Sequence, residues 1–358
     1  MSVAGGEKQD PVRKTELERR IGKERLWGDG QLDLFGKPAA PPALDARLEA
    51  LAARLPRRVR LGTSSWTFPG WAGLVYRDRY RSERDFVRRS LGEYARHPLF
   101  RTVCIDRAFY APLTRDELRE YAGQLPADFR CVSKVFHELS TWVFPNHPRH
   151  GARAGRRNPH FLDVGLFEEL VGAPMRDAFA DHLGPLLIEV SPVHGPVDPQ
   201  EFVAALERFL GEAPPDLDYA FEIRDARLFG PRYLGALRAA GASHCFNLWS
   251  RMPPLGEQLR RTRGWVGSPL VVRLMLPPGK RYGDLAAAFS PFDRMQAPQP
   301  GMRDDVVALV RAAEEEGVES YVIANNKAEG SSPLTVAALA ERLGAPGFPG
   351  AGAPRSSQ

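Results

Sequence analysis

The sequence has few cysteines and no long apolar run. Its only cysteines, Cys104, Cys131 and Cys245, each lie in a segment with the pattern of a strand. We therefore expect buried, reduced thiols rather than disulfides or metal ligands. No stretch approaches the ~18 consecutive apolar residues of a membrane-spanning helix. Residues 1–7 also lack the apolar core of a signal peptide. We therefore expect a cytoplasmic protein without a membrane partner.

The chain also has no large excess of positive or of negative residues. The chain has 49 Lys and Arg against 44 Asp and Glu, a formal net charge of +5, and an isoelectric point near 9.2. This mildly basic balance permits an anionic small molecule or a nucleic acid as partner without requiring one. With 43% hydrophobic residues over 358 positions, the chain can bury a large core, either as one large α/β domain with tails or as two domains.

The first segment, residues 1–56, has a different pattern from the rest of the chain. Glycine and proline flank residues 28–38, so neither a helix nor a strand is expected to extend through them. Residues 31–35 of this stretch read QLDLF. This pentapeptide resembles the short peptide by which bacterial replication and repair proteins bind the DNA polymerase sliding clamp. We therefore interpret residues 1–56 as a flexible arm with a clamp-like peptide and short helices.

The resemblance implies a role for each residue of the peptide. Leu34 and Phe35 would fill an apolar pocket of the clamp, beside Leu32, and the Gln31 amide would form directional hydrogen bonds. The sliding clamp is therefore one hypothetical partner. The alternative is that the three apolar side chains only pack the arm against the body of the protein.

Strand-like and helix-like segments alternate from residue 57 onward. The expected strands are Val59–Ser64, Thr102–Asp106, Arg130–Lys134, Pro185–Val190, Asp218–Arg224, Ser243–Leu248, Leu270–Leu274 and Ser320–Asn325. The expected helices are Glu83–Ala95, Arg115–Gln124, Asp163–His182, Pro199–Gly211, Pro231–Ala240, Leu255–Arg261, Arg303–Glu316 and Leu334–Leu343. Eight strands, each followed by a helix, predict a single (β/α)8 TIM-like barrel over residues 57–343.

Two further observations bear on this fold. The strands are rich in Val, Ile, Leu, Phe and Cys, as expected when both faces of a sheet are covered. An open doubly wound sheet is the competing arrangement, but no glycine-rich dinucleotide loop follows the first strand. Residues 344–358 are rich in glycine, proline and alanine, and we expect a short disordered tail there.

Two insertions interrupt the repeat. Residues 136–162 combine several arginines and histidines with interleaved aromatic side chains, and they follow the third strand. Loops after the strands of a barrel lie on its active face, so this segment is either a basic lid over an anionic ligand or a solvated surface loop. Residues 277–300 form the second insertion, from which we infer no chemistry.

Polar residues end several of the expected strands, after an apolar stretch. These residues are Asp106, Lys134, Glu189, Glu222, Arg224, Arg273 and Asn325. Because side chains alternate along a strand, Lys134 shares a face with Val132, and Glu222 with Ala220. The C-terminal ends of barrel strands are where catalytic residues of TIM barrels lie. An unpaired buried charge is costly, so these groups must pair, bind a ligand or remain hydrated.

Two interpretations of this rim remain open. In the functional one, Glu222, Glu189 or Asp106 acts as general acid or base, with a pKa set by neighbouring cations. An anionic, phosphate-containing ligand is then held by Lys134, Arg224 and Arg273, with Asn325, Asn326 and a stacking Trp66 as further ligand-binding residues. In the structural interpretation, the charged residues form a closed salt-bridge layer above the core.

Several segments resemble the YecE-like family, also called domain of unknown function 72. The resemblance rests on Leu61–Trp71 (LGTSSWTFPGW), Cys104–Tyr110, Phe129–Lys134, Leu183–Leu187, Glu222–Arg224, Val272–Leu274 and Ala324–Asn326, in this order along the chain. It implies a single TIM-like barrel whose biochemical activity is unassigned. This sequence departs from the family pattern at three places. It has Asp106-Arg107-Ala108 where the family has Glu-Asn-Ser or a similar tripeptide, Glu189 where the family has Gln, and Ser64-Ser65-Trp66 where the family has Ser-Gly-Trp.

Other chemistries fit the sequence less well. A retaining glycosidase needs two close carboxylates, which Glu189 and Glu222 could supply, but Arg273 ends the seventh strand where many such enzymes place a nucleophile. A metal site would have to be assembled from His137, His194 and two carboxylates, and these lie in no recognised ligand spacing. We therefore assign no metal, and the sequence identifies no cofactor.

The leading hypothesis is an enzyme, such as a hydrolase, that acts at the rim on an anionic, phosphorylated or nucleic-acid substrate. The arm would link this enzyme to replication or repair. The alternative is a non-catalytic adaptor at the replication machinery.

Overall fold

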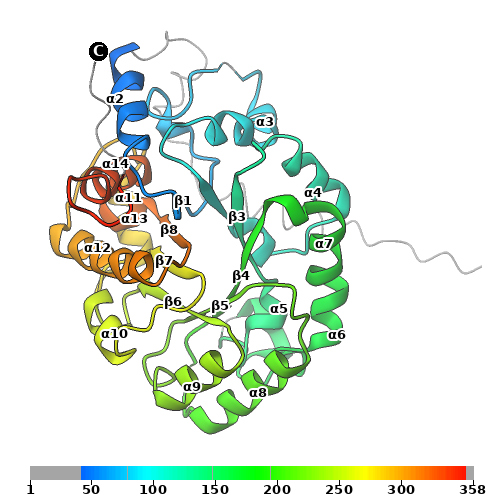
Figure 1. The fold of residues 1–358 in the computed structure, drawn as a ribbon. Coiled ribbons are helices and arrows are strands. Elements are labelled where there is room, and N and C mark those ends of the chain that lie inside the picture. The colour runs from blue at the N-terminus through cyan, green and yellow to red at the C-terminus, as the bar shows by residue number, and fades with distance from the viewer. Residues whose placement is uncertain (1–41, 79, 147, 194, 352–358) are drawn as a thin grey trace, which may run out of the picture.

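The computed structural model describes residues 42–78, 80–146, 148–193 and 195–351. Eight parallel strands close into a barrel in sequence order (Figure 1). The strands are β1 (Val59–Thr63), β2 (Thr102–Ile105), β3 (Arg130–Lys134), β4 (Leu183–Val190), β5 (Tyr219–Ile223), β6 (Ser243–Leu248), β7 (Leu270–Leu274) and β8 (Ser320–Ala324). The prediction of a TIM-like barrel is therefore confirmed, and the open doubly wound sheet is excluded.

Helices cover the outside of the barrel. The helices of four or more residues are α2 (Pro42–Ala52), α3 (Glu83–Ala95), η3 (Asp106–Phe109), α4 (Arg115–Ala122), α5 (His137–Ser140), η4 (Pro148–Arg153), α6 (Val164–Phe167), η5 (Glu168–Gly172), α7 (Ala173–Phe179), α8 (Pro199–Glu212), α9 (Pro231–Ala239), α10 (Leu255–Arg261), α11 (Tyr282–Phe289), α12 (Pro300–Glu315), α13 (Asn326–Glu329) and α14 (Ser332–Leu343). Two three-residue 3₁₀ turns, η2 (Pro69–Trp71) and η6 (Ala180–His182), complete the set.

Local sequence accounts for where several of these helices begin. Thr114 and Glu117 form a reciprocal capping box at the start of α4, and Ser82 accepts a hydrogen bond from the Asp85 amide at the start of α3. Proline occupies the first turn of α8, α9, α12 and α14, where a missing N–H costs nothing. The segment predicted as one helix over 163–182 is instead built from α6, the π-helical turn η5, α7 and η6.

The strand side chains divide into two buried sets. One set points outward and packs under the helices in the main core. The other points into the barrel and consists of Cys104, Val132, Leu187, Ala220, Cys245, Val271, Tyr321 and Ile323. All three cysteines are buried and free, as predicted. The interior of the barrel is therefore a packed apolar layer, and residues two positions further along each strand lie above it.

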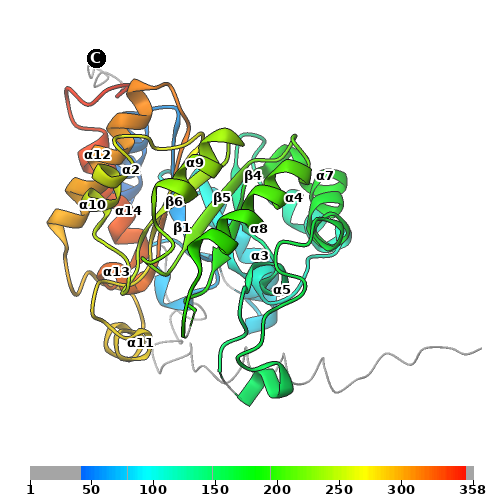
Figure 2. The same ribbon diagram turned by 90° about the horizontal axis from the view of Figure 1, so that it is seen from below.

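The insertions after β3 and β7 project on one side of the barrel. Figure 2 shows α5, which follows β3, and α11, which follows β7, on the same side of the strands. This is the side of the strands' C-terminal ends, because each helix comes directly after its strand. The loops that frame a candidate site therefore belong to the face on which TIM barrels place their chemistry.

Both ends of the chain are only partly described. Residues 1–41, and with them the clamp-like peptide, lie outside the described residues. Of the segment predicted as a tail, residues 344–351 are described, and Phe348 is buried there beside the guanidinium of Arg311, at 5.1 Å from the ring centroid. Within the described residues, no helix is long and apolar enough to cross a membrane.

Candidate functional site

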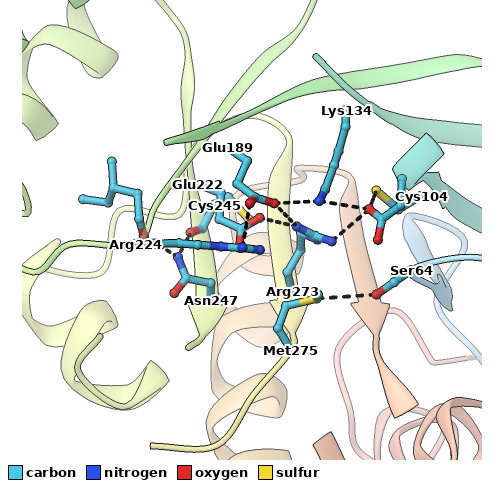
Figure 3. A network of polar contacts seen from close by, with 12 residues as sticks. Ser64, Cys104, Lys134, Glu189, Glu222, Arg224, Cys245, Asn247, Arg273 and Met275 are labelled. Carbon is cyan, nitrogen blue, oxygen red and sulfur yellow. Dashed lines mark hydrogen bonds and ion pairs between the residues drawn. The ribbon is translucent and has the colours of Figure 1, made fainter. Parts of the chain in front are cut away.

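Each strand of the barrel brings a polar residue to its C-terminal end. The eight residues are Ser64, Asp106, Lys134, Glu189, Glu222, Asn247, Arg273 and Asn325. Seven of them follow a member of the inward-facing apolar layer by two positions: Cys104 precedes Asp106, for example, and Ile323 precedes Asn325. Ser64 also faces inward, because its hydroxyl lies 3.5 Å from the sulfur of Met275, two residues after Arg273 (Figure 3). The closed parallel barrel therefore brings these strand ends to one mouth.

Glu222 lies at the centre of a buried ion network. Its side chain has no exposed surface, and both carboxylate oxygens are bonded. Oε1 accepts a hydrogen bond from Nε of Arg224 at 2.9 Å and lies 2.8 Å from Nη2 of the same residue, and Oε2 pairs with Nη1 of Arg273 (Figure 3). The carboxylate therefore joins two guanidinium groups and has no oxygen directed at solvent.

Glu189 occupies the neighbouring position on β4 and is bound by all three cations. Its Oε1 lies 2.6 Å from Nη1 of Arg224, and its Oε2 lies 2.6 Å from Nζ of Lys134 and 3.5 Å from Nη1 of Arg273. Burial acts to raise the pKa of Glu189, but the three cations outweigh it and lower this pKa to about 2. Glu189 is therefore held as a carboxylate by its three cationic neighbours.

Asp106 is the most exposed carboxylate of the network. Its side chain is 25% exposed, compared with 5% for Glu189 and 0% for Glu222. Its Oδ1 lies 3.1 Å from Nη2 of Arg273 and 3.4 Å from Nζ of Lys134, longer than the Lys134–Glu189 contact. The Cys104 thiol donates to the same oxygen at 3.2 Å. Among the described residues, every contact of Asp106 in the network is made by Oδ1.

The network contains equal numbers of positive and negative groups. Three carboxylates face Lys134, Arg224 and Arg273, so the formal charges cancel. Burial acts to lower the pKa of Lys134 and of Arg273, but the carboxylates raise both above their usual values, and each stays protonated. Burial raises the pKa of the Cys104 and Cys245 thiols beneath the network, so both remain neutral.

Aromatic rings border the network on two sides. The Arg224 guanidinium lies 4.0 Å from the ring centroid of Trp249, and Nζ of Lys134 lies 4.8 Å from the centroid of Phe109. The indole N–H of Trp249 is buried without a hydrogen-bond partner among the described residues, as is Oδ1 of Asn247. Such orphaned groups are rare in folded proteins and are often satisfied by water or a ligand.

The sequence analysis missed Asn247 and Trp249. Because side chains alternate along a strand, both residues lie on the same face as inward-facing Cys245. This alternation can be read from the sequence alone. The Asn247 side chain donates to the carbonyl of Ile223 at 2.9 Å, so it links β6 to β5 below Arg224.

Three predicted ligand-binding residues make their contacts elsewhere. The Trp66 ring packs edge-on against Tyr121 of α4, with 5.3 Å between the centroids. Asn325 caps α13 by accepting from the amide of Lys327 at 3.0 Å. Oδ1 of Asn326 accepts from Nε1 of Trp71 at 3.2 Å and from the amide of Ser332 at 2.8 Å, so this side chain fixes the turn into α14.

The basic insertion after β3 is engaged with its own neighbours. Arg153 pairs with Glu138, and its guanidinium lies 4.5 Å from the Phe144 centroid. Arg157 pairs with Glu201 of α8 and stacks on Trp142. Among the described residues, no group of three or more His, Cys, Asp and Glu is placed to hold a metal ion, and His147 and His194 lie outside these residues.

The same chain can now be compared with known proteins. A family model described as "Protein of unknown function DUF72" matches residues 60–357. The chain belongs to this family.

Solved structures agree with the fold. A DUF72 family protein from Enterococcus faecalis V583 is similar with a TM-score of 0.53 and 17% identity, over 80% of this chain and 94% of that one. A DUF72 family protein from Thermotoga maritima MSB8 gives a TM-score of 0.52 and 18% identity, over 80% of this chain and 98% of that one. At these identities the likeness shows the fold alone. Among curated proteins, no match was found.

Proposed function

We propose that this protein is an enzyme that binds an anionic, phosphate-containing ligand at the C-terminal rim of its barrel. The observation that carries the proposal is that two buried cations, Lys134 and Arg273, meet at one weakly held, partly exposed carboxylate, Asp106. Burying six charges in a barrel mouth is costly, and an apolar layer of similar volume would serve stability as well or better. The network is therefore more readily explained by chemistry than by stability.

A ligand anion must compete with the protein's own carboxylates, because each of the three cations already has one. Glu222 and Glu189 are nearly inaccessible and closely bound, whereas Asp106 is held at longer distances and reaches solvent. We infer that a phosphate oxygen displaces Oδ1 of Asp106 and takes its place opposite Nη2 of Arg273 and Nζ of Lys134. When no ligand is bound, the Asp106 carboxylate therefore occupies the position of the phosphate oxygen.

Displacement also assigns the acid–base roles. Asp106, once released, is a carboxylate at the edge of the bound ligand and can accept a proton from it. Lys134, held as an ammonium by Glu189, stabilises negative charge on the ligand. Glu189 and Glu222, predicted as catalytic candidates, act in this proposal as positioning residues that fix the cations.

The test is the binding of inorganic phosphate to Asp106→Asn, measured by calorimetry. This substitution removes the competing charge and leaves the network with one excess positive charge. We expect it to bind phosphate at least about tenfold more tightly than the wild type, since a unit charge at this distance contributes a few kcal/mol at an intermediate dielectric. Asp116→Asn on α4, whose side chain is 93% exposed, is the matched control and should bind as the wild type does. Equal, weak binding by all three proteins would refute the proposal.

A second function, a non-catalytic adaptor at the replication machinery, is favoured by a different observation. The ion network is charge-neutral and mostly inaccessible, which is what a structural layer requires. In this case the barrel would be a docking body, and the peptide at 31–35 would recruit it to the sliding clamp.

A further inference from the structure

An apolar groove of about 270 Å³ lies between α2 and α14, away from the rim. Its apolar lining is formed by Leu48, Leu51, Leu74, Pro333, Leu334, Ala337 and Ala338. Several of these side chains, including Leu48, Leu74 and Leu334, are only half-buried. The helices therefore leave apolar surface uncovered, which commonly marks a place where another segment binds.

A polar pair borders the groove. Nη2 of Arg47 on α2 lies 2.7 Å from Oε1 of Glu341 on α14, and both side chains are more than half exposed. This ion pair ties the two helices together beside the apolar strip. The groove thus has the form of an apolar floor with a charged margin, which fits a short apolar peptide better than a polar ligand.

The chain's own N-terminal segment ends beside this groove. Phe35 lies seven residues before Pro42, the first residue of α2. Seven residues span at most ~25 Å, and Leu48 lies only ~9 Å along α2 from Pro42. A chain that turns back along α2 can therefore bring Leu34 and Phe35 to the groove. Residues 36–41 are Gly, Lys, Pro, Ala, Ala and Pro, so these two are the nearest large apolar side chains.

The other end of the chain does not supply a competing occupant. Residues 352–358 read GAPRSSQ and carry no large apolar side chain. The N-terminal segment, by contrast, carries large apolar side chains within reach of the groove.

We propose that Leu34 and Phe35 bind in cis in the groove between α2 and α14. The same two side chains are those that the clamp hypothesis places in a pocket of the sliding clamp. If that hypothesis holds, cis binding and clamp binding exclude each other, and the groove regulates recruitment by holding the peptide until the clamp competes for it. Binding in cis itself does not depend on the clamp or on the rim.

Hydrogen exchange on the full chain, without any clamp, tests the cis contact. We expect amides of residues 32–36 to exchange at least about tenfold more slowly than in an unprotected peptide. Ala338→Arg, which places a long charged side chain in the groove, should restore exchange to about the unprotected rate. Ala239→Arg on the exposed end of α9 is the matched control and should leave the protection unchanged. Unprotected exchange in the wild type, or protection that survives Ala338→Arg, would overturn the proposal.

A reciprocal variant keeps the test informative if Ala338→Arg fails to fold. Leu34→Ala plus Phe35→Ala leaves the barrel sequence intact and should increase exchange in the stretch 334–338 of α14 by about threefold or more. Unchanged exchange there would count against the groove as the binding site. Because neither experiment includes clamp or phosphate, failure here is distinct from failure of the proposed function.

Discussion

Arg273 contacts all three carboxylates of the ion network. Its guanidinium is fully buried and contacts Glu222, Glu189 and Asp106, which come from three different strand ends. The nitrogen Nε of the same side chain is buried without a hydrogen-bond partner among the described residues. One donor of the Arg273 side chain thus lacks a partner, while its other nitrogens hold three carboxylates together.

Replacing Arg273 by Met should therefore be strongly destabilising. It leaves three carboxylates facing two cations in a buried site, and breaking such a network typically costs ~3–5 kcal/mol in the free energy of unfolding. Urea denaturation measures the loss. Adding Glu222→Gln should recover part of it, because the second change removes the unpaired charge. Arg119→Met, in an exposed pair on α4, is the control and should cost less than ~1 kcal/mol. A loss below ~1 kcal/mol in Arg273→Met would show that the pairs are not formed.

The end of β6 is fixed by a second buried polar cluster, on the outer face of the barrel. Gln258 of α10 accepts from the amide of Asn247 at 3.2 Å and donates to its carbonyl at 2.8 Å. His244 lies between Gln258, at 3.3 Å, and the Tyr233 hydroxyl of α9, at 3.1 Å. The cluster thus attaches two helices to the strand that carries Asn247 into the site.

This cluster predicts acid sensitivity in a defined pH range. Burial lowers the pKa of His244 to about 4 from an ordinary value of 6.5, so the unfolded state binds the proton first. The contribution of His244 to stability is full above pH 6.5 and is lost as the pH falls toward 4, by up to about 3 kcal/mol. Urea denaturation from pH 7 to 4 should show this slope in the wild type and a flatter one in His244→Gln. Equal slopes would contradict the assignment. The ionised Glu189 adds a separate loss at lower pH, between its ordinary value of 4.5 and about 2.

The elements also show what the sequence could and could not predict. Alternation along single strands placed Lys134, Glu189, Glu222 and Arg273 on the inner face, because it depends only on local geometry. Which carboxylate meets which cation could not be predicted: Asp106 and Arg273 are 167 positions apart and meet across the mouth of the closed barrel. Asn326 was misjudged for a related reason, since its partners Trp71 and Ser332 come from other elements.

At the scale of the whole molecule, the chain combines a closed barrel (Figure 1) with residues 1–41, which precede α2 in the sequence. The barrel was predictable because the pattern of a strand followed by a helix occurs eight times along the sequence. The clamp-like peptide at 31–35 stays a prediction, and its resemblance is visible in the sequence because such binding motifs are short and local. The two parts therefore need separate tests, since a substitution in the peptide leaves the barrel sequence unchanged.

A pull-down with purified sliding clamp tests the role of the peptide. Gln31→Ala plus Phe35→Ala removes the predicted hydrogen-bonding amide and the largest apolar side chain of the motif. We expect recovery of the full chain to fall at least about tenfold, because apolar anchors of this kind commonly contribute 2 kcal/mol or more to binding. Asp29→Ala plus Lys37→Ala, which flanks the motif, should be recovered like the wild type. The control variant Asp29→Ala plus Lys37→Ala should also unfold at the wild-type temperature, because it changes neither the barrel nor the apolar residues of the peptide. Equal recovery of all three proteins would separate this protein from the clamp, and the rim would then carry the whole of its function.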